Sequence, residues 1–236
     1  MVQAAGMAFE CCRVFTYSIA NFSTFRCAKQ IRNDVDYHKL PVTLVAVGDG
    51  VAYVALGYSH HAGQDYALMR CMPNMLIAAP GDPMEVRACM RSLANNPQPS
   101  YLRLGKAGAP CFHLDVPEVE PGLWLKVSSK CIMRDNKILL TIGPSLKTAM
   151  IWLGSESYAD HHVYSLPLWG QSGKLAQILQ VTKATSITTM EDHFMDGGVD
   201  SWLLESVANE GGMTERIRIV ALDSSVCGMV GSQSTL

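Results

Sequence analysis

The chain has 236 residues, of which 48% are hydrophobic and 17% are charged, a balance typical of folded globular proteins. Its formal net charge is -2 and it has no run of basic residues, which argues against nucleic acid or an anionic membrane as a partner. No segment approaches the roughly 18 apolar residues that a membrane-spanning helix needs, so we expect a soluble protein.

In the first half of the chain, short apolar runs alternate with stretches of helical periodicity. This pattern favours a mainly parallel sheet covered by helices. Asp82 and Pro83 precede an amphipathic stretch and suit the N-cap and first position of a helix. The predicted strands are 13–19, 41–47, 75–80 and 100–105, and the predicted helices are about 22–37, 64–72 and 82–95.

From Lys106 to Ser129 the periodicity fails, and three prolines give the segment the composition of a linker. A second alternation follows, with strands at 137–143, 162–169, 186–192 and 217–223 and helices at 145–153, 172–183 and about 199–209. We therefore predict the α/β class with two domains, each a mainly parallel sheet flanked by helices. The first domain is expected at 1–106, the linker at 107–129 and the second domain at 130–236.

The eight cysteines are scattered and form no C-x-x-C motif, so neither a zinc site nor a disulfide framework is indicated. They are typical of small buried side chains in a reducing compartment. The opening "MVQAAGMAFECCR" lacks the basic and apolar regions of a secretion signal, which predicts a cytoplasmic protein. The cysteines are Cys11, Cys12, Cys27, Cys71, Cys89, Cys111, Cys131 and Cys227.

The segment "GDGVAYVALGYSHHAGQD" (48–65) joins a predicted buried strand to a helix, and ligands of open α/β sheets bind beyond such strand ends. His60 and His61 in this segment suit proton transfer, because imidazole titrates near neutral pH. A hydrogen-bonded turn with one surface histidine explains the same pattern. Asp65 suits the first turn of the next helix. No third ligand accompanies the histidine pair, so no metal site is predicted.

Two longer stretches, "YSIANFSTFRCAKQIRNDVDYHKLPV" and "LGYSHHAGQDYALMRCMPNMLIAAPGDPMEV", resemble the pyrimidine-binding domain of the transketolase family, which includes deoxyxylulose-phosphate synthase. The later "TTMEDHFMDGGVDSWLLE" and "CGMVGSQ" resemble the C-terminal domain of that family. The resemblance covers almost the whole chain. Within the family, the chain is similar in particular to split transketolases, in which a separate polypeptide carries the diphosphate-binding domain.

The resemblance implies a C-terminal transketolase subunit that transfers a two-carbon ketol unit between sugar phosphates. It implies thiamine diphosphate as cofactor, with Mg²⁺ or Ca²⁺ held mainly by an N-terminal diphosphate-binding partner subunit. A homodimer or heterotetramer would then form the active site at a subunit interface, and the isolated chain would be inactive. The resemblance leaves open a non-catalytic structural or regulatory subunit, and a related thiamine enzyme such as deoxyxylulose-phosphate synthase.

By resemblance, His60 is the catalytic histidine that faces substrate and cofactor, and His61 is a subsidiary substrate-binding residue. Phe25 matches the aromatic residue that packs on the aminopyrimidine ring, with Phe22 near the same pocket. From their spacing alone, the two phenylalanines are equally well explained as residues of the hydrophobic core.

Two basic residues near the end of the strand predicted at 100–105 match the phosphate-binding region of the family. Lys106 matches the basic residue that holds the sugar phosphate, and Arg103 lies close behind it. Alternatively, Lys106 and Arg103 are solvated side chains at the end of the strand, without a role in binding. Glu191, Asp192 and His193 match a motif that is structural or lines an interface.

Two departures from the family pattern stand out. The glutamate that activates the cofactor belongs to a segment that resembles "MVQAAGMA" and would precede Met1, while Glu10 does not match its place. Leu56 replaces an acidic residue four positions before His60. Truncation, a partner that supplies the lost groups, and loss of catalysis are the three explanations, and truncation of a catalytic subunit is the expectation.

Overall fold

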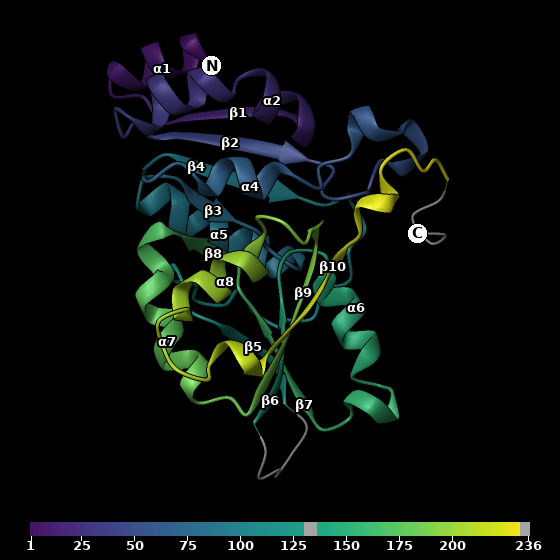
Figure 1. Cartoon of the computed structure of the whole chain (residues 1–236). Helices are drawn as coiled ribbons and strands as arrows, with labels where there is room; N and C mark the ends of the chain where they lie inside the picture. Colours follow the sequence, from purple (N-terminus) through teal and green to yellow (C-terminus); the bar gives the residue numbers. More distant parts are fainter. Residues whose placement is uncertain (130–135, 232–236) are drawn as a thin grey trace.

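Two five-stranded sheets organise the chain, and helices flank each of them (Figure 1). The computed structural model describes residues 1–129 and 136–231. The predicted α/β class with two mainly parallel sheets is confirmed. Cys131 lies outside the described residues, and the seven other cysteines are unpaired. Five of these seven are exposed and only Cys89 is buried, so the prediction of buried cysteines is wrong for most of them. Within the described residues, no helix is both long enough and apolar enough to cross a bilayer.

The first sheet has the strand order β1-β2-β4-β3-β8. Its inner strands consist mainly of buried β-branched and apolar residues, as expected for parallel strands covered on both faces, with Ser100 and Arg103 of β4 as polar exceptions. Only β8 runs antiparallel to its neighbour. The strands are β1 (Val14–Ile19), β2 (Val42–Val47), β3 (Leu76–Ala78), β4 (Ser100–Leu104) and β8 (Leu168–Gly170).

The second sheet has the order β10-β9-β6-β7-β5, with β5 antiparallel at one edge. Leu139 in β6 pairs with Val163 on one side and Thr188 on the other, and the first two of these side chains belong to one buried apolar cluster. The strands are β5 (Leu125–Ser129), β6 (Lys137–Thr141), β7 (His161–Ser165), β9 (Ser186–Phe194) and β10 (Ile217–Leu222).

The helices begin and end largely where sequence signals place them. At α5 the side chain of Asp82 accepts hydrogen bonds from the backbone N–H groups of Met84 and Glu85, so the predicted cap is confirmed. The α-helices are α1 (Val2–Phe9), α2 (Ala20–Arg26), α3 (Ala28–Gln30), α4 (Asp65–Arg70), α5 (Pro83–Asn95), α6 (Ser145–Trp152), α7 (Lys174–Thr182) and α8 (Val199–Val207). The shorter turns are a π-helix, η1 (Ile31–Asp36), and the 3₁₀ turns η2 (Val54–Leu56), η3 (Tyr58–His60), η4 (Glu156–Tyr158), η5 (Gln171–Gly173), η6 (Thr214–Arg216) and η7 (Ser224–Val226).

A shared hydrophobic core joins the two sheets. Trp169 of β8 and Trp202 of α8 are both fully buried, with ring centroids 5.6 Å apart. Tyr66 of α4 packs edge-on against Trp169 at 5.3 Å. The first sheet is thus packed against the helices of the second half of the chain.

The strand predicted at 162–169 is wrong as a single element. Residues 161–165 form β7 in the second sheet, whereas residues 168–170 form β8 in the first sheet. Pro167 separates them, because it lacks an N–H group for a strand ladder, while its carbonyl accepts a hydrogen bond from Ala79. The chain therefore crosses between the sheets at this proline.

Two further predictions need correction. The end of the predicted linker, residues 125–129, is strand β5, which pairs with β7. The helix predicted at 22–37 is broken into α2, α3 and the π-helix η1. In η1 the Tyr37 N–H bonds to the Arg32 carbonyl, a spacing of five residues, and Ile31 and Val35 both stay fully buried.

Candidate functional site

The segment between β2 and α4, residues 48–64, forms what we term the His60 loop and lies at the carboxyl end of the first sheet. Gly57 has φ +76°, a left-handed conformation that favours glycine, and it starts the turn η3 that carries His60. Ala62 donates a backbone hydrogen bond of 2.7 Å to Gly50, so the loop folds back on itself. These two features hold the histidine pair beside α2.

His60 is half-buried and contacts two groups that are near it in space. Its Nδ1 lies 3.0 Å from the Ser59 hydroxyl oxygen, and its ring meets the edge of Phe22 with centroids 5.0 Å apart. Phe22 is 43% exposed and Phe25 is 47% exposed, so the reading of these residues as core phenylalanines is wrong. Phe22 and the imidazole of His60 therefore meet at an open surface, with exposed Phe25 on the same helix α2.

His61 points inward, unlike His60. It is only 4% exposed, yet neither ring nitrogen has a hydrogen-bond partner among the described residues. It lines a cavity of about 210 Å³ together with Asn21, Phe25, Tyr58, Ser59 and Gln64. A buried polar group without a partner is costly, which makes this cavity a place for a ligand atom that donates or accepts a hydrogen bond.

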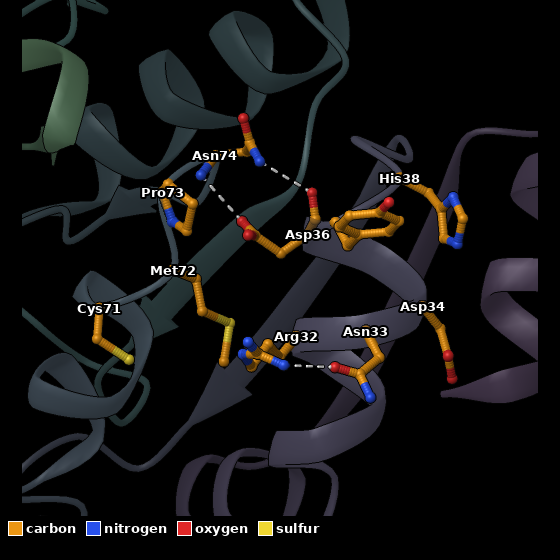
Figure 2. Close-up of a pocket in the computed structure, with 10 residues that line it drawn as sticks. Arg32, Asn33, Asp34, Asp36, His38, Cys71, Met72, Pro73 and Asn74 are labelled. Carbon is orange, nitrogen blue, oxygen red and sulfur yellow. Dashed lines mark hydrogen bonds between the residues drawn. The ribbon is translucent and has the colours of Figure 1, made fainter.

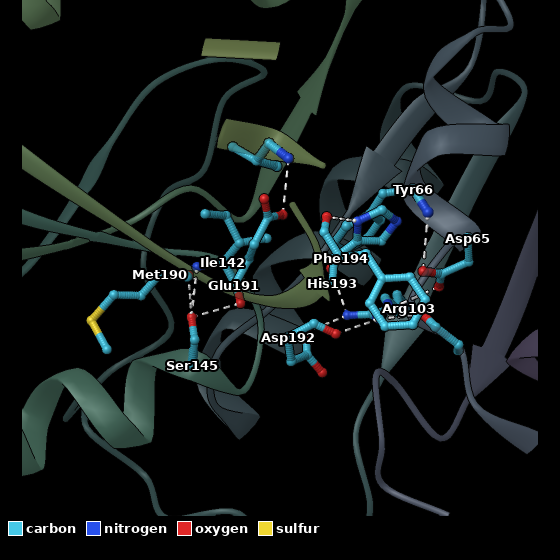
Figure 3. A network of polar contacts seen from close by, with 12 residues as sticks. Asp65, Tyr66, Arg103, Ile142, Ser145, Met190, Glu191, Asp192, His193 and Phe194 are labelled. Atoms are coloured by element: carbon cyan, nitrogen blue, oxygen red, sulfur yellow. Dashed lines mark hydrogen bonds and ion pairs between the residues drawn. The ribbon is translucent and has the colours of Figure 1, made fainter. Parts of the chain in front are cut away.

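Arg103 lies behind the His60 loop and is fully enclosed (Figure 3). Its Nε donates to Asp65 at 2.7 Å, and its other nitrogens donate to Tyr66, Asp192 and the carbonyl of Ala62. The guanidinium also stacks over the Tyr66 ring at 4.3 Å. The carbonyl contact means that Arg103 braces the loop that carries the histidines.

The charges around Arg103 decide its ionisation. Burial lowers the pKa of the guanidinium, but Asp192 and Asp65 outweigh burial, so its pKa lies well above the usual value. Asp49 beside this network is also buried, and its Oδ2 has no partner among the described residues. Burial, and then the nearby charge of Asp192, raise the pKa of Asp49 to about 8. One carboxyl group of the network is thus protonated at neutral pH.

Lys106 is exposed at the surface two residues beyond β4. Its Nζ lies 4.9 Å from the centroid of the Tyr53 ring in the His60 loop. The interpretation as a solvated strand end is therefore wrong for Arg103, which is enclosed and bonded to protein groups, whereas Lys106 is open to solvent. Leu56 of the same loop is 56% exposed.

The motif at 191–193 joins the second sheet to the first. Asp192 pairs with Arg103, and the His193 ring stacks on Tyr66 with centroids 5.2 Å apart. Burial lowers the pKa of His193. Glu191 instead accepts hydrogen bonds from the first backbone N–H groups of α8. These contacts agree with a structural and interface motif.

A separate cavity of about 670 Å³ lies between η1 and the turn after α4 (Figure 2). Asp36 and Asn74 join its two walls through hydrogen bonds of 3.0 Å. Burial raises the pKa of Asp36. None of the predicted site residues lines this cavity.

The most important side chain that sequence reasoning missed is Asp65. It is in the first turn of α4, as its position predicts, but its burial was not foreseen: it is fully buried and accepts a hydrogen bond of 2.6 Å from the Tyr101 hydroxyl. Asp65 is far in the sequence from Tyr101 and Arg103 of β4, so no local spacing links the acid to these two partners. The signal available was an arginine inside the apolar run "SYLRLG", since a buried arginine needs an acidic partner.

Known proteins resemble this chain in sequence and in fold. Residues 1–110 match the model of the transketolase pyrimidine-binding domain. Over 209 residues the chain is 36% identical to a subunit of the apulose-4-phosphate transketolase of Phocaeicola vulgatus, and the match covers 87% of this chain and 65% of that protein. Over 217 residues it is 27% identical to a putative transketolase C-terminal section of Methanocaldococcus jannaschii, and the match covers 92% and 67% of the two chains. This chain thus spans about two thirds of the length of these relatives.

Among solved structures, the chain is similar to one described as a split gene transketolase, inactive beta4 tetramer. The TM-score is 0.80 at 25% identity, and the match covers 95% of this chain and 72% of the other. The similarity extends through both sheets, including the second half that lies beyond the pyrimidine-binding match.

Proposed function

The chain belongs to the transketolase family, and on that premise we propose that it is the C-terminal subunit of a thiamine-diphosphate-dependent transketolase. In this proposal it transfers a two-carbon ketol unit between sugar phosphates, together with a separate N-terminal subunit that binds the diphosphate. The observation that carries the proposal is the contact of Phe22 with His60 at the carboxyl end of the first sheet, beside exposed Phe25 of the same helix.

The residues in this cluster fit one end of the cofactor. A flat aminopyrimidine ring needs aromatic contact and hydrogen-bond partners. Phe25 is exposed and lines the cavity together with His61, whose ring nitrogens have no hydrogen-bond partner among the described residues, and Phe22 is exposed on the same helix. The diphosphate and its Mg²⁺ or Ca²⁺ are assigned to the partner subunit. A homodimer or a heterotetramer would complete the site at an interface, and the isolated chain would be inactive.

When bound, thiamine diphosphate supplies the nucleophilic carbon needed to break and make bonds next to a carbonyl group. His60 moves protons to and from the sugar hydroxyls, for which an imidazole is suited at neutral pH. Ser59 lies at Nδ1, which leaves Nε2 as the nitrogen that meets the substrate. His61 contributes a hydrogen bond to a polar group that enters the cavity.

Lys106 holds the phosphate of the sugar as an exposed point charge. Arg103 is proposed to position the His60 loop without touching the substrate, because its hydrogen bonds go to protein groups, among them the carbonyl of Ala62 in that loop. This arrangement ties the substrate-binding loop to the end of β4. The unpaired cysteines support a reducing, cytoplasmic location.

The proposal is tested by reconstitution. The chain is mixed with a diphosphate-binding transketolase subunit, and ketol transfer from a ketose phosphate to an aldose phosphate is measured with and without thiamine diphosphate. Activity that requires both subunits and the cofactor supports the proposal. Absence of activity together with absence of cofactor binding in calorimetry would remove it. Pyruvate as an alternative donor separates a ketol transferase from a synthase-type thiamine enzyme.

The rival is a non-catalytic structural or regulatory subunit, a function that the similarity to an inactive beta4 tetramer also supports. His60→Asn separates the two, with His38→Asn at an exposed position as the matched control. Under the proposal, His60→Asn lowers kcat of the complex by at least about a hundredfold and His38→Asn leaves it unchanged. Equal activity of the two variants would favour the rival.

A further inference from the structure

A cluster outside the proposed active site brings together three residues with metal-ligating side chains. Asp82 and Glu85 stand at the start of α5, and His113 comes from the segment after β4. One ligand atom from each lies within 4.8 Å of the others. The His113 Nδ1 is 3.0 Å from Asp82 Oδ2 and 3.9 Å from Glu85 Oε1. No sequence pattern predicts this arrangement, since His113 is distant from the two acids in the sequence.

The cluster is enclosed and incompletely bonded. The side chains of Asp82 and Glu85 are 0% exposed and that of His113 is 11% exposed. Glu85 Oε2 accepts hydrogen bonds from Gly81 N–H and Ser165 Oγ, but Glu85 Oε1 has no partner among the described residues. A buried carboxylate oxygen without a donor calls for a cation or a proton at that position.

We propose that Asp82, Glu85 and His113 bind a divalent cation of the zinc type. One imidazole nitrogen and two carboxylate oxygens are a donor set that zinc accepts in tetrahedral sites, with water in the fourth position. The metal takes the place of the proton shared by His113 Nδ1 and Asp82 Oδ2. The neutral imidazole then carries its proton on Nε2, and any proton on the carboxyl group of Glu85 is released to solvent.

Two features oppose a cation here, and both are outweighed. The N-terminus of α5 carries about half a positive elementary charge, whereas the two carboxyl groups, once they bind a metal in the ionised form, supply two negative charges at shorter range. The second opposing feature is that Asp82 Oδ2, the oxygen that would bind the cation, already accepts hydrogen bonds from the backbone N–H groups of Phe112 and His113. These bonds hold the carboxylate in place, so its oxygen is already oriented toward the imidazole.

The bound metal would be structural. It would fasten the segment around His113 to the first sheet, and the Glu85 contact with Ser165 at the end of β7 extends the tie to the second sheet. The site shares no residue with the His60 loop. Its occupancy is therefore separable from ketol transfer.

The test uses the full chain, stripped of metal with a chelator and titrated with Zn²⁺ in a calorimeter. His113→Asn is the main variant, because an asparagine side chain still offers a donor to Asp82 and preserves the cap. Glu85→Gln is the second. Each is expected to weaken zinc binding by at least about tenfold. Zinc should raise the Tm of the wild-type chain and leave that of His113→Asn unchanged.

Exposed thiols are a rival source of zinc binding, and Cys111 is near His113 in the sequence. Cys111→Ser is the matched control and should bind zinc like the wild type. Co²⁺ substitution adds a spectroscopic readout, since thiolate ligands give a charge-transfer band that nitrogen and oxygen ligands lack. No saturable binding, equal binding by His113→Asn, or a thiolate band lost in Cys111→Ser would overturn the proposal.

Discussion

Arg103 in β4 forms an ion pair with Asp192 in β9, so a buried charge pair connects the two sheets. The side chain of Arg103 is 1% exposed and that of Asp192 is 19% exposed. The same guanidinium donates to the carbonyl of Ala62 in the His60 loop. This one side chain therefore contributes both to the contact between the sheets and to the placement of the His60 loop.

Asp192→Asn is expected to lower the free energy of unfolding by about 3 kcal/mol, because it removes one partner of a buried ion pair. Asp65 remains as a counter-charge, which keeps the loss at the lower end of the range for such pairs. Urea unfolding followed by tryptophan fluorescence measures the change. Asp196→Asn, at an exposed position nearby, is the control and should change stability by less than about 0.5 kcal/mol. Equal losses in the two variants would contradict the assigned role of the pair.

The raised pKa of Asp49 is expected to make the stability of the chain depend on pH. Its carboxyl pKa is about 8 in the folded chain, mainly through burial, against an ordinary value of 3.8. The folded state therefore holds a proton that the unfolded state loses, and stability from this group falls as pH rises from about 4 to about 8. Asp49→Asn mimics the protonated form and removes this decline.

Urea unfolding between about pH 5 and about pH 9 tests this assignment of Asp49, because the window spans the upper part of the decline and the plateau beyond it. The stability of Asp49→Asn relative to wild type should increase from about pH 5 to about pH 8 and level off above that pH. Parallel curves for the two proteins would show that the carboxyl group does not titrate there.

Sequence patterns predicted the features that depend on neighbours in the chain. The strand β2 reads as a buried parallel strand because its six residues are apolar or β-branched. Asp82 and Pro83 mark the start of α5 through their capping chemistry. The position of the histidine pair at a strand end followed from the alternation of elements. In each case the signal lies within a few residues.

The features that were missed depend on residues far apart in the chain. Arg103 bonds to Asp65 and to Asp192, at separations of 38 and 89 residues, and no local period encodes such contacts. The division of the run 162–169 between two sheets is likewise decided by which edges are available to pair. Pro167 was the one local sign of that division.

Lys106→Ala is expected to raise KM for a phosphorylated sugar by about tenfold in the reconstituted complex, with a small effect on kcat, because a charge-assisted contact to phosphate is lost. A sugar without phosphate should show no such change. Lys147→Ala, exposed on α6, is the matched control. Steady-state kinetics with both sugars make the comparison. An equal rise in KM for the two sugars would assign Lys106 a role other than phosphate binding.

Glu205 on α8 joins two cations from other elements. It bonds to Arg70 of α4 at 2.6 Å and to Lys174 of α7 at 2.8 Å, and hydrogen bonding from Arg70 is the main cause that lowers its pKa to about 2. Stability from a carboxylate with a depressed pKa is present above about pH 4.5 and is lost as pH falls toward about 2. The side chain is 47% exposed, so solvent screening limits the contribution to about 1 kcal/mol or less.

Glu205→Gln should therefore reduce stability slightly at neutral pH, and the difference from wild type should shrink as pH falls from about 4.5 toward about 2. High salt should shrink it as well, because exposed ion pairs are screened. Glu156→Gln, also exposed, serves as the control. Thermal unfolding at several pH values and salt concentrations measures both effects. A difference that persists unchanged at low pH would mean that Glu205 acts through packing, since a charge pair cannot survive protonation of its carboxylate.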